Sequence, residues 1–499
     1  MSEKMPNWLK QRAYLTPERP AIITKHETLS FQELLIRVEQ LADQLTTVGV
    51  RQGMHCALLI QNNIDSIVLI RALETIGAIS VMLNIRLTEK ELAWQMNDAD
   101  VSYCFYTSDF QDKALTAGKE VQSIKLYSIT QVKSLKTSSS SSRSMFKLDE
   151  LHTIMYTSGT TGKPKGVMMT YGNHWWSAIG SSLNLGIAEK DRWLICVPLF
   201  HVSGLSILMR SLFYGITIVL HERFEADAVN TSIINEQVTM ISVVSAMLTT
   251  MLKQLGEETY PENLRCVLLG GGPAPMPLLE LCKHKRVPVF QTYGMTETAS
   301  QIVTLSPEYM LSKLGSAGKP LFPAQLRIVQ DGQDMERNNE GEIVVCGPNV
   351  TKGYYKRPDA TEITIQQGWL HTGDMGYLDK DGFLYVLDRR SDLIISGGEN
   401  IYPAEIESVL LEHPSVLEVG VCGVESERWG EVPAAVLVFE KNSFCSGIEL
   451  KQFLEERLAK YKIPKVFYSV EKLPRNASMK LLRRTLKSWI KHEKLTLLH

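Results

Sequence analysis

The sequence lacks a charge excess, is poor in cysteine and has no internal repeat. Its 499 residues carry 53 basic and 55 acidic side chains, a formal net charge of −2, so the chain is not a polycation suited to nucleic acid. Eight cysteines form no C-x-x-C pair and no Cys/His cluster with zinc spacing, which is typical of reduced thiols in a cytoplasmic protein. The first dozen residues contain charges but no apolar core, so we expect no signal peptide.

The most apolar stretch, residues 193–209, has no Lys, Arg, Asp or Glu. It is shorter than the roughly 20 apolar residues that a transmembrane helix needs, and it contains Pro198, His201, Ser203 and Gly204. We therefore expect a buried strand, a turn and a core helix there, and no membrane span.

Hydrophobic residues make up 44% of the chain and charged residues 22%, as in globular proteins, and the length predicts two to four domains. In the first part of the chain, short apolar runs alternate with helical patterns, as in residues 54–60, Ile64–Ile76 and 78–83. The same alternation occurs in residues 265–269, 276–282 and 287–291. This pattern predicts βαβ units and parallel sheets covered on both faces.

The pattern changes in the last third of the chain. Short strands separated by Asp-Gly turns predict an antiparallel region, with strands at residues 325–329, 342–346, 376–378 and 383–387. After Asp392 the sequence predicts a separate α+β unit, with elements at residues 403–413, 416–424, 434–439 and 448–460.

The segment with the most specific chemistry is YTSGTTGKPKG, residues 156–166. Glycines let backbone N–H groups approach an anion closely, and hydroxyl and ammonium groups complete a phosphate cradle. It differs from a kinase-type P-loop, because only two residues separate Gly159 from Gly162 and Pro164 follows Lys163. The alternative is a surface loop rich in Gly, Ser and Thr.

This segment resembles the phosphate loop of the acyl-adenylate-forming superfamily, which comprises acyl-CoA ligases, luciferases and peptide-synthetase adenylation domains. Further matches follow in the superfamily's order: Gly270-Gly271-Gly272-Pro273, Tyr293-Gly294-Met295-Thr296-Glu297, Trp369-Leu370-His371-Thr372-Gly373-Asp374, Asp388-Arg389-Arg390-Ser391-Asp392 and Ile395-Ser396-Gly397-Gly398-Glu399-Asn400-Ile401. The resemblance implies an α/β fold like that of acyl-CoA synthetases. A large adenylation domain, residues 1–390, would consist of packed mixed and parallel sheets with helices plus a β-rich subdomain. A small mobile α+β lid domain, residues 391–499, would turn about a hinge near Ser391.

The resemblance also implies roles for individual residues. ATP would bind to Thr157, Ser158, Gly159, Thr160, Thr161, Gly162, Lys163, Gly271, Gly272, Tyr293, Asp374 and Arg389. Thr296 would contact the α-phosphate and Glu297 would hold Mg²⁺, while Ser391, Gly397, Gly398 and Glu399 would serve the hinge and the coenzyme A channel. Lys480 would reach the carboxylate during adenylation, although Met479 replaces the glycine that usually precedes this lysine. If that position needs positive φ, the methionine costs free energy there.

Elementary chemistry agrees with this assignment. A carboxylate is a poor electrophile, and its attack on the α-phosphate of ATP converts it to a mixed anhydride with AMP as leaving group. A carboxylate such as that of Glu297 suits the Mg²⁺ that neutralises the departing pyrophosphate, and the phosphate loop would stabilise the shifting charge. No side-chain nucleophile is needed, which fits the lack of a clear Ser-His-Asp arrangement.

The acid substrate is indicated by residues 197–211, VPLFHVSGLSILMRS. The resemblance implies that His201 lines the acid pocket, where the superfamily has an aromatic residue or a His. Amino-acid-activating relatives usually place an Asp at this position after Phe200, so an amino acid is an unfavoured substrate. Arg210, on a helix leaving the pocket wall with Ser203 near its start, suits a second carboxylate; a surface ion pair is the alternative. This stretch and residues 6–21, PNWLKQRAYLTPERPA, resemble the o-succinylbenzoate–CoA ligases of menaquinone biosynthesis.

The sequence thus predicts a cytoplasmic, AMP-forming acid–thiol ligase that uses ATP, Mg²⁺ and coenzyme A and has no nucleic-acid partner. His201, Thr296, Glu297 and Lys480 are its expected catalytic residues. A ligase for a fatty or aryl monocarboxylic acid, a carrier-protein-loading enzyme and an inactive nucleotide-binding homologue remain as alternatives. Both a monomer and a homo-oligomer stay open.

Overall fold

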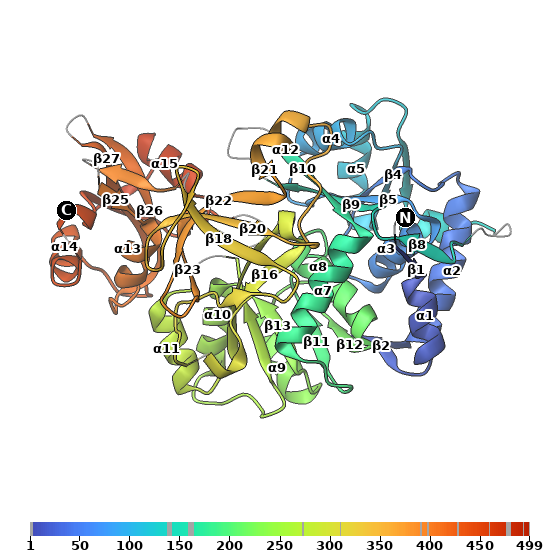
Figure 1. The fold of residues 1–499 in the computed structure, drawn as a ribbon, viewed down its shortest axis with the longest axis horizontal. Coiled ribbons are helices and arrows are strands. Elements are labelled where there is room, and N and C mark those ends of the chain that lie inside the picture. Colours follow the sequence, from blue (N-terminus) through green and yellow to red (C-terminus); the bar gives the residue numbers. More distant parts are fainter. Residues whose placement is uncertain are drawn as a thin grey trace.

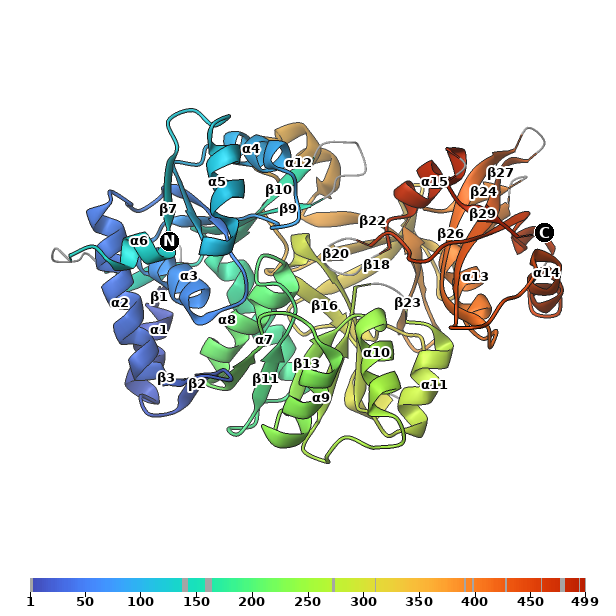
Figure 2. The same cartoon turned by 180° about the vertical axis from the view of Figure 1, so that it is seen from behind.

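The computed structural model describes residues 3–136, 142–157, 164–271, 274–309, 311–389, 392–396, 399–426, 429–458, 460–475, 481–492 and 494–498. These residues form four large sheets and a two-stranded ribbon in which β1 (Lys4–Pro6) pairs with β8 (Met145–Lys147). The molecule is elongated, with the N-terminal helices at one end and the C-terminal sheet at the other (Figures 1 and 2).

The first large sheet has the strand order β10-β9-β5-β4-β6-β7. Its strands are β4 (His55–Leu59), β5 (Ile79–Met82), β6 (Tyr103–Tyr106), β7 (Lys125–Ser128), β9 (Leu151–Thr157) and β10 (Lys165–Thr170). All neighbours run parallel except β10, which returns antiparallel to β9. The expected βαβ unit is confirmed, because α3 (Ile64–Ile76) joins β4 to β5.

The second sheet has the order β17-β16-β15-β14-β13-β11-β12-β2-β3. Its strands are β2 (Pro20–Ile23), β3 (Thr28–Ser30), β11 (Arg192–Ile195), β12 (Thr217–Leu220), β13 (Met240–Val243), β14 (Cys266–Leu269), β15 (Val289–Met295), β16 (Ser300–Thr304) and β17 (Lys319–Pro320). In this sheet order the six strands β15, β14, β13, β11, β12 and β2 run parallel to one another. At the two edges, β16, β17 and β3 pair antiparallel with their neighbours.

Helices cover these two sheets (Figure 1). They are α1 (Trp8–Leu15), α2 (Phe31–Thr47), α4 (Glu89–Asp98), α5 (Gln111–Gly118), α6 (Ile129–Lys133), α7 (Tyr171–Leu185), α8 (Val202–Tyr214), α9 (Ala226–Asn235), α10 (Ser245–Leu255) and α11 (Met276–His284). The apolar stretch forms β11, a turn and α8, as expected. In the part of the chain that the structure describes, no helix combines the length and apolarity needed to span a bilayer.

The main core joins α2, α3, α7 and α8 to both sheets. Helix α3 is buried on nearly every side, which explains why its sequence is apolar almost all round. Helix α8 ends at Gly215, whose φ of 68° is readily adopted only by glycine. All eight cysteines are free thiols and seven are buried, as expected for reduced cysteines.

The third sheet is antiparallel throughout, which confirms the predicted change in the last third of the chain. It comprises β18 (Gln325–Gln330), β19 (Gln333–Asp334), β20 (Gly341–Cys346), β21 (Ile365–Gln366), β22 (Trp369–Leu378) and β23 (Leu384–Arg389), with α12 (Pro358–Thr364) beside it. Strand β22 begins at Trp369 and is longer than the segment predicted at residues 376–378. A register shift opposite β20 absorbs Gly373, whose φ is +72°, so a turn-like sequence continues the strand.

The fourth sheet consists of β24 (Ile394–Ser396), β25 (Glu399–Ile401), β26 (Val416–Ser426), β27 (Gly430–Phe439), β28 (Val466–Ser469) and β29 (Thr496–Leu497). Helices α13 (Pro403–Leu410), α14 (Gly447–Glu455) and α15 (Arg483–Lys491) pack on it. It has a separate core, which fits the expected α+β unit after Asp392.

Candidate active site

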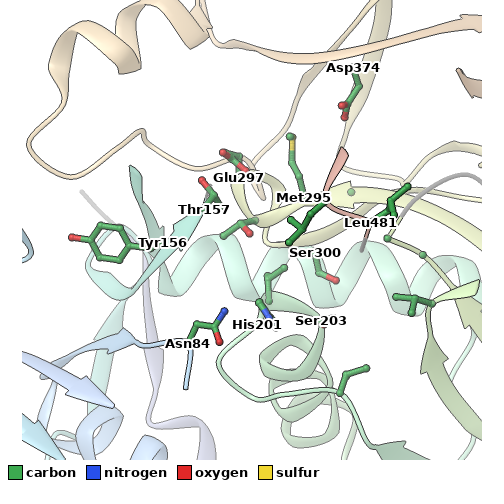
Figure 3. A pocket seen from close by; sticks show the side chains of 18 of the residues that line it. Asn84, Tyr156, Thr157, His201, Ser203, Met295, Glu297, Ser300, Asp374 and Leu481 are labelled. Carbon is green, nitrogen blue, oxygen red and sulfur yellow. The ribbon is translucent and has the colours of Figure 1, made fainter. Parts of the chain in front are cut away.

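A cavity of about 2550 Å³ opens between the N-terminal sheets and the C-terminal sheet. Pockets for one small molecule are commonly about 300–1,000 Å³, so this cavity has room for a nucleotide and a second reactant. Residues from β9, β15, β22 and α8 line it on one side, and residues from α15 line it on the other. Figure 3 shows side chains from several elements gathered around this space, among them Thr157, His201 and Glu297.

Helix α8 forms the wall at one end of the cavity. Ser203, Ser206 and Arg210 all line it, because spacings of three and four residues place them on one face of the helix. His201 lies immediately before the helix and lines the same space. The structure therefore brings together the three residues predicted to bind the acid, His201, Ser203 and Arg210.

Arg210 is a buried cation in the wall of the cavity. It is 1% exposed, and its Cζ lies 5.4 Å from the ring centre of Trp193. Among the described residues, neither its Nε nor its Nη2 has a hydrogen-bond partner. These nitrogens form the edge of the guanidinium that donates two parallel hydrogen bonds to a carboxylate. Burial lowers the pKa of Arg210, and a bound anion would compensate the buried charge.

His201 is held neutral by its surroundings. Burial, with a smaller contribution from Arg86, lowers the pKa of His201 to about 4. Its Nε2 finds no partner in the described part of the chain, and its ring centroid lies 4.7 Å from that of Phe200. At neutral pH the imidazole therefore offers the cavity a polar atom without a charge.

The other end of the cavity is formed by the turn between β15 and β16. Tyr293 Oη donates a 2.8 Å hydrogen bond to Asp374 Oδ2, which joins two of the predicted nucleotide motifs. Glu297 accepts a 3.0 Å hydrogen bond from Tyr354 Oη, and its backbone carbonyl accepts one of 2.7 Å from Thr351 N. Ala299 and Ser300 have φ values of 52° and 98°, and such strained backbone clusters at functional sites.

Thr157 is the last residue of β9 and lines the cavity, as does Gly271 with a φ of 89°. The preceding Tyr156 is anchored to α4, because its Oη donates a 2.8 Å hydrogen bond to Asp98 Oδ2. The predicted phosphate segment therefore starts at the cavity wall.

Several predicted site residues lie outside the described residues. They are Ser158, Gly159, Thr160, Thr161, Gly162, Lys163, Gly272, Ser391, Gly397, Gly398 and Lys480. The side chains of Arg389 and Glu399 are likewise not described. Leu481, next to Lys480 in the chain, lines the cavity (Figure 3).

Sequence reasoning missed four residues of the site. Trp193 supports Arg210 and is itself fixed by a 3.2 Å hydrogen bond from its Nε1 to Ser242 Oγ. Gln301 lines the cavity and donates from Nε2 to Thr304 Oγ1 at 3.1 Å, while its Oε1 has no partner among the described residues. Ser242 itself lines the cavity, and Tyr354, which donates a hydrogen bond to Glu297, is the fourth missed residue. These residues lie in strands or loops that contain no recognisable motif. The only sequence signal was the alternation of polar and apolar residues along a strand, which indicates the face of the sheet that a side chain occupies.

Comparison with known proteins agrees with this geometry. A model of the family described as AMP-binding enzyme matches residues 9–355, and a model of the AMP-binding enzyme C-terminal domain matches residues 405–480. A 2-succinylbenzoate–CoA ligase from Bacillus cereus is 56% identical over 490 residues, which are 98% of this chain and 99% of that protein.

Two solved structures of o-succinylbenzoate coenzyme A synthetase from Bacillus subtilis have the same fold. The complex with the acyl-adenylate intermediate has a TM-score of 0.92 and 51% identity, covering 97% of this chain and 98% of that one. The complex with ATP and magnesium ion has a TM-score of 0.91 and 52% identity, covering 97% of this chain and all of that one. This chain therefore belongs to the AMP-binding enzyme family, the acyl-adenylate-forming group that its motifs indicate.

Proposed function

We propose that this protein is the AMP-forming ligase that joins 2-succinylbenzoate to coenzyme A in menaquinone biosynthesis. The products are 2-succinylbenzoyl-CoA, AMP and diphosphate. The activity of the 56% identical relative and the acyl-adenylate held by the structural relative support this reaction. The observation in this molecule that carries it is the edge of Arg210 in the cavity wall, whose Nε and Nη2 have no acceptor among the described residues.

The reaction has two steps. In the first, an oxygen of the succinyl carboxylate attacks the α-phosphorus of ATP, the bond to the β-phosphate oxygen breaks, and diphosphate leaves. In the second, the sulfur of coenzyme A, having lost its proton, attacks the acyl carbon, and AMP leaves with the electrons of the acyl–oxygen bond. Both steps need stabilisation of charge on phosphate oxygens rather than a side-chain nucleophile.

The substrate fits the chemistry of the α8 wall. Its molecule has two carboxylates, of which one must react and the other can be held. We assign the aromatic carboxylate to Nε and Nη2 of Arg210, with Ser203 and the neutral His201 beside it. A fatty acid would leave the buried guanidinium uncompensated, which is unfavourable.

We assign ATP to the opposite end of the cavity. Thr157 and the segment 158–163 would contact the phosphates, and Thr296 the α-phosphate. Asp374, accepting from Tyr293, would bind the ribose hydroxyls, and Gly271 and Gly272 would lie beside the adenine. Arg389 would complete this set.

Glu297 fits a magnesium ligand. The residue is 7% exposed and lines the cavity, and Tyr354 orients its carboxylate. Mg²⁺ prefers such hard oxygen donors, with substrate phosphates as its other ligands. When bound, Mg²⁺ supplies positive charge that offsets the charge developing on diphosphate.

We further propose that residues 391–499 act as a lid on residues 1–390, with the hinge near Ser391. Lys480 would serve the first step in one arrangement. In the other, Gly397, Gly398 and Glu399 would border the entry of coenzyme A. The position of Leu481 at the cavity supports the first arrangement for this structure.

The test is an ATP–pyrophosphate exchange assay with 2-succinylbenzoate, 3-benzoylpropionate (the same molecule without its aromatic carboxylate), benzoate and a fatty acid. Coenzyme A is then added and thioester formation is measured. We expect the highest kcat/KM with 2-succinylbenzoate. Preference for a monocarboxylic acid would contradict the substrate assignment, and ATP binding without exchange on any acid would indicate an inactive homologue.

A further inference from the structure

A second buried arginine, Arg71, lies behind the helix that carries Arg210. Arg71 is on α3 and is 1% exposed. Its Nη1 lies 2.6 Å from Glu74 Oε2 in an ion pair whose two side chains are 1% and 0% exposed. Neither residue lines the cavity, so this pair takes no direct part in the proposed reaction.

Arg71 contacts α8 at the two residues that precede Arg210. Its Nη2 donates a 2.8 Å hydrogen bond to the backbone carbonyl of Leu208, and its Nη1 lies 3.3 Å from Met209 Sδ. The buried guanidinium of Arg71 is therefore hydrogen-bonded to the face of α8 that points away from the cavity, while Arg210 lies on the face that lines the cavity.

Glu74 extends this attachment to the first sheet. His152 on β9 lies 3.3 Å from Glu74 Oε2. Burial alone would raise the pKa of Glu74, but Arg71 and His152 outweigh it, and the pKa lies below its ordinary value. Glu74 is thus ionised, and the cluster formed by Arg71, Glu74 and His152 connects α8, α3 and β9.

A buried ion pair contributes little net stability, because removing both charges from water costs about as much as their attraction returns. Its contribution is more often geometric, since hydrogen bonds of fixed length specify one arrangement. A helix wall that must present a guanidinium to a carboxylate within a few tenths of an ångström needs such a constraint.

We propose that Arg71 is a positioning residue for the acid substrate: its contacts with Leu208, Met209 and Glu74 set the depth and rotation of α8, and thereby the place of Arg210. This rests on the proposed role of Arg210 in binding the second carboxylate. Arg71 acts through Arg210 and touches no substrate.

The test uses the variant Arg71→Met/Glu74→Gln, which removes both charges and keeps an amide within reach of His152. We expect the KM for 2-succinylbenzoate to rise at least fivefold. The KM for 3-benzoylpropionate, the KM for ATP and kcat should stay within twofold. In an Arg210→Met background the same double change should alter the KM for 2-succinylbenzoate by less than twofold, because nothing remains to be positioned.

A matched control replaces another arginine–carboxylate pair, Arg265 with Asp191, which are 2.5 Å apart and do not line the cavity. Arg265→Met/Asp191→Asn should lower the unfolding temperature without changing the ratio of the two acid KM values. If Arg71→Met/Glu74→Gln does not fold, Arg71→Lys replaces it. A lysine keeps the charge opposite Glu74 but lacks the second nitrogen that reaches Leu208, so the same selective rise in KM is expected.

The proposal is overturned if the KM ratio stays at the wild-type value, if both acids are affected alike, or if the effect persists in the Arg210→Met background. Wild-type exchange with 2-succinylbenzoate is measured first. Its absence would contradict the proposed function, whereas its presence with any of these three results contradicts the role of Arg71 alone.

Discussion

Two buried arginines, Arg71 on α3 and Arg210 on α8, have opposite surroundings. Arg71 is paired with Glu74 and with the carbonyl of Leu208, whereas Nε and Nη2 of Arg210 find no acceptor among the described residues. A buried cation without hydrogen-bond acceptors lowers the free energy of unfolding. Proteins commonly give up stability in this way at sites that must bind a ligand. At the residue scale this contrast separates the charge that is paired within the protein from the charge that we propose binds the substrate.

Arg210→Met should therefore separate binding from stability. Removing the charge-assisted hydrogen bonds to a carboxylate costs about 1.5–3 kcal/mol, so the KM for 2-succinylbenzoate should rise about 10- to 100-fold. The KM for 3-benzoylpropionate should change little, and the unfolding temperature should stay equal or increase. Pyrophosphate exchange and thermal unfolding measure these quantities. An equal effect on both acids would refute the assignment of Arg210.

His201 should make folding sensitive to acid. Its pKa of about 4 in the folded protein lies below the unfolded value of about 6.5. Between these values the unfolded chain takes up a proton that the folded chain does not, so this contribution is complete above about pH 6.5 and is lost as the pH falls toward 4. When the pH falls from 7.5 to 5, the free energy of unfolding of His201→Phe should therefore decrease by about 2 kcal/mol less than that of the wild type. Denaturant unfolding at both pH values tests this; parallel losses would show that His201 is not responsible.

At the scale of elements, the turn from β15 to β16 depends on a glycine. A Cβ at Gly294 would lie 2.0 Å from the carbonyl oxygen of Ser300, across the hairpin. The register between the strands also shifts between Tyr293 and Gly294. This close approach gives the glycine of the Y-G-x-T-E motif a packing reason, because it lets the turn that carries Thr296 and Glu297 close tightly.

Gly294→Ala should open this turn. Overpacking of this kind typically costs about 1–3 kcal/mol, and we expect the KM for ATP to rise more than tenfold because Thr296 and Glu297 are displaced. The control is Gly332→Ala in the turn between β18 and β19, where φ is +78° but a Cβ would meet nothing within 4 Å. That variant should lose stability and keep its KM for ATP. Unchanged ATP affinity in Gly294→Ala would disprove the packing argument.

At the scale of the whole molecule, three polar contacts join the described residues of the C-terminal unit to the rest. Lys253 Nζ lies 2.9 Å from Glu440 Oε1, Met276 N donates to Ser408 Oγ at 3.4 Å, and Tyr402 Oη donates to Glu340. Exposed ion pairs contribute only about 0–1 kcal/mol. These contacts can therefore be exchanged cheaply for another set, as the proposed lid requires.

Lys480→Ala should separate the two steps of the reaction. We expect it to abolish adenylate formation, measured by pyrophosphate exchange, because the proposed role of this lysine is confined to the first step. The attack of coenzyme A on a supplied acyl-adenylate should stay within about threefold of the wild type. Arg484→Ala on α15, which also lines the cavity, serves as a control for loss of one lid charge. Equal loss of both steps in Lys480→Ala would contradict the role given to it.

Local patterns were sufficient for much of this molecule. The periodicity of Ile64–Ile76 and the apolar run that becomes β11 and α8 each specify structure through neighbours in the chain. The ordered motifs, among them the glycine- and hydroxyl-rich segment, indicated the family. Such features depend on hydrogen bonds and spacings within a few residues. For this reason the sequence by itself determined the α/β fold, the family and the type of reaction.

Only the tertiary structure decided which polar groups are paired. The local spacing of Arg71 and Glu74 allows an ion pair along one helix. Only packing decides that Arg71 also meets Leu208, 137 residues away, and that Nε and Nη2 of Arg210 have no acceptor among the described residues. The same holds for Trp193 beneath Arg210 and for Tyr354 beside Glu297. Pairing and burial are properties of the packed chain, because they depend on which distant segments exclude water from the same place.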